Sequence, residues 1–191
     1  GMIHRLLGLL YQMRMRLDES ELMFKKSLSE FEQAKTDHTE GINGEIVLTE
    51  YCLSQLYPIT NKISEGYEIN ITLIPKLRKL ATEGKFDKSD FAGVLVNQAF
   101  YSNMLGKFDE GEKLSIEALE NDSTRNIALT NLAAAKLLQG NYKEAKELYL
   151  SIKTEFKDAL LADLDELAKR GAIPKERESD VKNIKRLLNE Q

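Results

Sequence analysis

The chain has 191 residues, of which 42% are hydrophobic and 30% charged, as in an ordinary soluble helical protein with a buried core. Its formal net charge of -4, with both signs interspersed, argues against nucleic-acid binding, because no basic patch displaces counterions from phosphates. Cys52 is the only cysteine, which excludes an intramolecular disulfide and a cysteine-rich metal site. No apolar run is long enough to span a bilayer, so we expect a cytoplasmic chain without membrane insertion.

Residues 2–37 predict a hairpin of two helices. The apolar run at the N-terminus is interrupted by Arg5 and lacks a small-residue cleavage site, so it indicates a helix and not a signal peptide. The hairpin also carries a spaced set of small and aromatic residues at Leu7, Gly8, Tyr11, Ser20, Phe24 and Ser27.

Residues 38–90 give a weaker helical pattern. Residues 41–44 indicate a loop and residues 45–56 a helix, while Pro58 and Pro75 predict that helices start or break near them. The tract at 67–74 is rich in β-branched residues and could be extended, although its context favours helices. His38, beside Asp37 and Glu40, could bind a metal loosely, but a solvated loop is the favoured interpretation.

Residues 91–123 and 125–157 are two copies of one pattern. Gly106 and Gly140 lie 34 residues apart, and in this alignment Phe108 matches Tyr142. Each glycine follows an apolar helix pattern and can take the left-handed conformation that ends a helix. A third joint of the same kind begins at Gly84. The sequence therefore predicts a repeated hairpin with a glycine turn.

Residues 158–191 predict a C-terminal capping hairpin. Leucines at 160, 161, 164 and 167 form a stripe at helical spacing that Gly171 ends, and Pro174 opens a last, charged helix. The acidic residues Asp163, Asp165 and Glu166 indicate a solvated helix face.

A period of about 34 residues is that of tetratricopeptide (TPR) repeats. The N-terminal hairpin is also similar to this family, although Ser20 and Ser27 stand where the family has alanines. The resemblance covers residues 2–37 and 91–156 and is loose between 38 and 90. It implies an all-α, single domain over residues 1–191, built of antiparallel helix hairpins in a right-handed superhelix of about nine to ten helices. The stretch 171–177 is similar to tails of bacterial repeat proteins.

In this family the first helix of each hairpin lines a concave face that binds peptides or partner helices. The resemblance thus implies a partner site made of Val96, Asn97, Phe100, Met104, Thr130, Asn131, Ala134 and Leu138. The two asparagines could pair with a peptide backbone, or they could bond neighbouring helices and fix the packing. Val96 and Thr130 replace the basic residues of a carboxylate clamp, which argues against that mode of binding.

No cluster of nucleophile, base and metal ligands is evident in the sequence. We therefore expect no catalytic residues, cofactor or metal, and predict a non-catalytic scaffold for a protein or peptide partner. One alternative is a self-associating or regulatory module of a larger multidomain bacterial protein. A helical enzyme is the weakest alternative, because only the region of His38 supports it.

Overall fold

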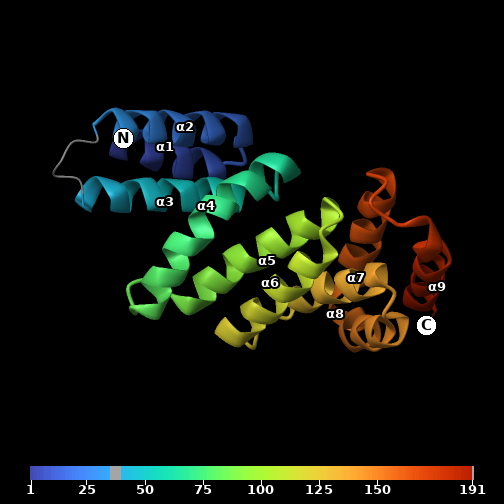
Figure 1. Ribbon diagram of the computed structural model, residues 1–191. Coiled ribbons are helices and arrows are strands. Elements are labelled where there is room, and N and C mark those ends of the chain that lie inside the picture. Colours follow the sequence, from blue (N-terminus) through green and yellow to red (C-terminus); the bar gives the residue numbers. More distant parts are fainter. Residues whose placement is uncertain (35–39, 191) are drawn as a thin grey trace. The chain divides into compact units, whose positions relative to one another are not determined.

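The computed structural model describes residues 1–34 and 40–190, and within them the chain is all α-helical, without a strand (Figure 1). These residues form nine α-helices and one short 3-10 helix, which confirms the predicted fold class. The chain divides into two compact units, Gly1–Phe86 and Asp87–Gln191. The first contains α1 (Met2–Met13), α2 (Leu17–Gln33), α3 (Glu40–Leu56) and α4 (Ile63–Thr82). The second contains α5 (Lys88–Met104), α6 (Phe108–Asn121), α7 (Ile127–Gln139), α8 (Tyr142–Lys169), η1 (Lys175–Arg177) and α9 (Glu178–Asn189).

In the first unit, α1 and α2 pack closely because α1 carries a glycine at their contact. Gly8 is buried, and a Cβ added there would lie 3.1 Å from Cγ of the fully buried Phe24. The Ser20 hydroxyl donates a hydrogen bond of 2.8 Å to the Gly8 carbonyl. The small and aromatic positions of the N-terminal motif thus form the seam between the two helices.

The region with the weakest sequence pattern is helical, as its context indicated, but two boundaries differ from the prediction. Residues 41–44, expected in a loop, lie in the first turns of α3. Pro75, expected to break a helix, lies inside the 20-residue α4. Pro75 has no N–H to donate to the Ile71 carbonyl. Both residues are exposed, so water can satisfy that carbonyl. Pro58 does follow the end of α3, as expected.

In the second unit, α5 and α6 form one hairpin and α7 and α8 form the next (Figure 1). Gly106 and Gly140 end α5 and α7 with positive φ angles of 75° and 96°. The left-handed joints predicted from the repeat are therefore confirmed. Tyr101 and Tyr149 are among the largest fully buried side chains of this unit.

Helix α8 is longer than predicted. We expected a break between Phe156 and Asp158, but α8 runs unbroken for 28 residues. Neither glycine nor proline stands there, and the buried side chains of Tyr149, Ile152 and Leu160 lie on one continuous face. The helix ends before Gly171, whose φ is 67°. The last helix begins after η1, and its Val181, Ile184 and Leu188 are buried.

Candidate functional site

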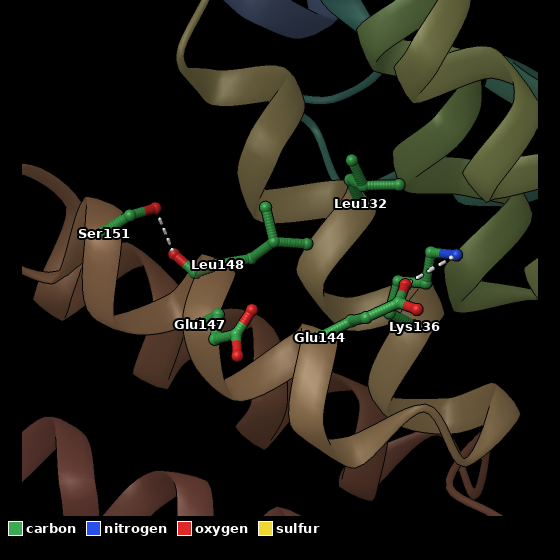
Figure 2. Close-up of a pocket in the computed structure, with 6 residues that line it drawn as sticks. All are labelled: Leu132, Lys136, Glu144, Glu147, Leu148 and Ser151. Atoms are coloured by element: carbon green, nitrogen blue, oxygen red, sulfur yellow. Dashed lines mark hydrogen bonds and ion pairs between the residues drawn. The ribbon is translucent and has the colours of Figure 1, made fainter.

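A surface pocket of about 470 Å³ lies on the hairpin formed by α7 and α8 (Figure 2). The joint at Gly140 sets these helices antiparallel, so side chains four residues apart on each helix face the same seam. The lining residues are Leu132 and Lys136 from α7 and Glu144, Glu147, Leu148 and Ser151 from α8.

Three polar side chains of this pocket, Lys136, Glu144 and Ser151, are bonded within the protein. Lys136 Nζ lies 2.8 Å from Glu112 Oε1 and 3.0 Å from Glu144 Oε2. The hydrogen bond from Lys136 lowers the pKa of Glu112, and in return the bonds to Glu112 and then Glu144 raise the pKa of Lys136. The Ser151 hydroxyl donates to the Leu148 carbonyl at 2.7 Å. The pocket thus offers leucine side chains and an acidic rim, which suits an apolar or basic group rather than an anion.

The predicted partner residues differ in their exposure. On α5, Asn97 and Phe100 are half-buried, and both belong to a face that also includes the half-buried Gly93. The other six predicted residues are buried: Val96, Met104, Thr130, Asn131, Ala134 and Leu138. On this face, Asn97 and Phe100 are therefore the predicted side chains best placed to meet a partner.

Two buried asparagines join α5 to α7. Asn131 Nδ2 donates to the Val96 carbonyl at 2.9 Å, and Asn103 Nδ2 donates to the Asn131 carbonyl at 2.9 Å. The first bond is of the packing kind that we considered for Asn131. The sequence interpretation missed Asn103. Its signal was Gly111 in α6, which stands where the next repeat has Ala145 and leaves room for the Asn103 amide.

A second pocket, of about 530 Å³, lies between the α5–α6 joint and the segment after α8. It places Met104 near Ile173, so this predicted residue faces the C-terminal part of its own unit. The lining residues are Met104, Leu105, Gly106, Phe108, Arg170, Gly171, Ala172, Ile173 and Pro174.

An ionisable group that the sequence interpretation placed in solvent is half-buried. Asp163 was expected on a solvated acidic face of α8, but burial raises its pKa to about 6. Its neighbour Asp165 does lie in solvent and accepts a hydrogen bond of 2.5 Å from Lys185 Nζ. Asp163 lies between Leu160 and Leu164, so the apolar stripe around it was the available signal.

The other reactive candidates show no catalytic arrangement in the part of the chain that is described. Cys52 is half-buried, and burial raises the pKa of its thiol, as suits a structural cysteine. Asp37 and His38 lie outside the described residues. Within residues 1–34 and 40–190, no group of three or more histidine, cysteine, aspartate or glutamate side chains is placed to hold a metal. No helix in these ranges is both long and apolar enough to cross a membrane.

Comparison with known proteins gives matches among solved structures. No protein-family profile matches the chain, and no curated protein matches it in sequence. Two crystal structures of a Podosopora anserina protein with nearly identical TPR-like repeats, described as a kinesin light chain, share the fold at 14% identity. One, a substituted form of that protein, has a TM-score of 0.58 over 97% of this chain and 91% of that one. The other has a TM-score of 0.57 over 97% and 92%. The chain therefore has the fold of TPR-like helical repeats.

Proposed function

We propose that this chain is a non-catalytic scaffold that holds a protein or peptide partner on the concave face of its TPR-like repeats. TPR-like folds generally serve as protein-interaction scaffolds, and their stacked hairpins provide extended binding surfaces. The pockets of the second unit support this function, because they combine apolar side chains with polar groups that are engaged in internal bonds.

The observation that carries the proposal is the accessible strip of α5. Gly93, Asn97 and Phe100 follow one another at spacings of four and three residues, so they share one face of the helix. A half-buried aromatic ring gives a partner a large apolar contact, and the asparagine amide next to it can donate and accept hydrogen bonds. In this arrangement the six buried residues of the predicted site pack beneath the strip and hold it in place: Val96, Met104, Thr130, Asn131, Ala134 and Leu138.

The pocket on α7 and α8 gives a partner a second point of attachment. Its acidic rim at Glu144 and Glu147 and its Leu132 and Leu148 side chains favour a partner segment with a basic or long apolar side chain. Raising the salt concentration should then weaken binding, and Glu147→Gln should reduce that salt dependence.

The test begins with affinity capture of partners from the source cell, followed by titration of each identified partner against the purified chain. We expect Phe100→Ala to raise the dissociation constant about tenfold or more, as loss of an aromatic anchor does. Phe156→Ala is the matched control, because Phe156 is a half-buried aromatic of the same unit on α8. Equal dissociation constants for the wild type and Phe100→Ala with every partner would overturn the α5 assignment.

A further inference from the structure

The turn between α6 and α7 places a guanidinium group at one end of the accessible strip of α5. Arg125 Nη1 lies 3.2 Å from the position that a Cβ of Gly93 would take, so the guanidinium fills the space that the glycine leaves. Gly93 begins the strip, which continues through Asn97 to Phe100. The Arg125 side chain is 28% exposed, so a segment lying along the strip can reach it.

Bonds to two neighbouring residues hold this guanidinium in place. Arg125 Nη2 donates to the carbonyl oxygen and to the hydroxyl oxygen of Ser89, at 2.8 Å in each case. Arg125 Nε lies 3.4 Å from Oδ2 of Asp122, which also accepts a bond of 2.7 Å from the Ser89 hydroxyl. Ser89 belongs to the first turn of α5, and Asp122 directly follows α6. The arginine is therefore already positioned in the free chain, and a partner does not have to order it.

This network leaves one donor group without an acceptor. Both oxygens of Asp122 are engaged, because Oδ1 accepts bonds from the backbone N–H and the hydroxyl of Thr124 at 3.0 and 2.6 Å. The bonds from Ser89 and then Thr124 lower the pKa of Asp122 to about 2, so this carboxylate stays ionised. Within residues 1–34 and 40–190, by contrast, Arg125 Nη1 has no hydrogen-bond partner. A hydrogen-bond acceptor on the partner therefore complements this end of the strip.

We propose that Arg125 determines the specificity of the partner surface on α5 by donating from Nη1 to an aspartate or glutamate side chain of the bound segment. This inference rests on the proposed function. A carboxylate fits better than a neutral carbonyl, because hydrogen bonds between ionised groups are roughly twice as strong. The cation comes from the turn before α7, whereas a clamp for a terminal carboxylate would use the helix positions that Val96 and Thr130 occupy.

The proposal also defines a charge pattern for the partner. The rim of the pocket on α7 and α8 is acidic at Glu144 and Glu147 and favours a basic side chain. The partner segment would thus carry an acidic group near Gly93 and a basic group at that pocket. Asp90 is exposed three residues before Gly93 on the same face of α5, and its carboxylate weakens the attraction for an acidic group.

The test uses peptides from a random display library that bind the whole chain and lose binding to Phe100→Ala. We expect aspartate or glutamate to be enriched at one position of these peptides. One of them is synthesised with both ends blocked, and a second copy carries the matching amide in place of the acidic residue. The amide should raise the dissociation constant about fivefold for the wild type and less than about twofold for Arg125→Gln. If Arg125 only held the turn in place, Arg125→Gln would weaken both peptides equally.

Three further variants, each checked by circular dichroism, control for charge and folding. Lys88→Gln removes an exposed positive charge from the first turn of α5 and should keep the preference for the acidic peptide. Gly93→Ala keeps the arginine but crowds Nη1, so it should reduce the preference even if Arg125→Gln fails to fold. Asp90→Asn should increase the affinity for the acidic peptide and leave that for the amide copy nearly unchanged.

The possible results separate this inference from the proposed function. Peptides that depend on Phe100 but show no acidic preference, or that keep this preference with Arg125→Gln, would overturn the inference and leave the partner surface on α5 intact. Binding that requires a free carboxyl end would assign the contact to a chain terminus and would also overturn it. If no selected peptide depends on Phe100, the proposed surface on α5 fails and the inference fails with it.

Discussion

Replacing Gly111 by alanine should destabilise the second unit, although alanine is the better helix former. A Cβ at position 111 would lie 2.9 Å from Cγ of Asn103 and closer still to its Oδ1. It would also lie 3.3 Å from the Ala99 carbonyl oxygen. The Asn103 side chain is buried, and its Nδ2 holds the 2.9 Å bond to the Asn131 carbonyl. The amide therefore cannot move aside without losing that bond.

The magnitude follows from three contributions. Overpacking a buried contact costs about 1–3 kcal/mol, and loss of the buried hydrogen bond costs about 1 kcal/mol more. The helix preference of alanine over glycine offsets at most about 1 kcal/mol. We therefore expect Gly111→Ala to lower the free energy of unfolding by about 2 kcal/mol. In an Asn103→Ala background the overlap disappears, and the same substitution should be neutral or should stabilise by up to about 1 kcal/mol.

Urea unfolding followed by circular dichroism, for the wild type, both single variants and the double variant, measures this double-mutant cycle. Amide hydrogen exchange then shows whether the loss is confined to α5, α6 and α7. A coupling of about 2–3 kcal/mol between positions 103 and 111 is expected. A coupling below about 0.5 kcal/mol, or a stabilising Gly111→Ala in the wild type, would refute the close approach of this amide to α6.

Two further predictions concern Asp163 and the left-handed joints. Because the pKa of Asp163 is raised to about 6, the folded chain holds that proton more tightly than the unfolded chain, so stability falls as pH rises from about 4 through about 6. Asp163→Asn should therefore raise the free energy of unfolding near pH 7 by up to about 2 kcal/mol, seen as a higher melting temperature, and by much less near pH 4. The exposed Asp158→Asn should change little, and an equal shift at both pH values would contradict this. In urea unfolding, Gly140→Asn should lower the free energy of unfolding by about 2 kcal/mol and Gly106→Asn by about 1 kcal/mol. The two differ because a Cβ at Gly140 would lie 2.5 Å from Arg177 Cζ, whereas Gly106 has open space. Arg177→Ala should remove part of that difference; equal costs at both glycines would show that Arg177 plays no part.

The sequence was informative wherever one residue determines the backbone. Gly106 and Gly140 were recognisable as joints, because few residues other than glycine adopt the positive φ that these helix ends require. Gly8, Ser20 and Phe24 belong to the N-terminal pattern that is similar to TPR repeats, and in the structure they form the seam of the first hairpin. These local constraints were sufficient to predict the hairpins and the fold class.

The errors arose where tertiary packing overrides local preference. Pro75 has no backbone N–H for a helix hydrogen bond, yet α4 continues through it. The two residues that the missing bond would join, Ile71 and Pro75, are both exposed to solvent. The end predicted for α8 near Phe156 rested on repeat length, whereas the apolar face of that helix continues in phase to Leu167. Asp163 lies between Leu160 and Leu164 of that face and is half-buried, whereas its acidic neighbours alone had indicated a solvated face.

The face proposed to bind a partner shows how two repeats can match in sequence and differ in exposure. Asn97 and Asn131 occupy equivalent positions, but Asn97 is half-buried while Asn131 is buried and bonded to Val96. Equivalent positions therefore do not provide equivalent contacts, and the accessible half of this face is the one on α5. Beyond Met104, that strip meets the pocket wall formed by residues 170–174. A partner segment that follows α5 toward its C-terminal end would thus contact the segment after α8, so binding should depend on that segment as well as on the repeat.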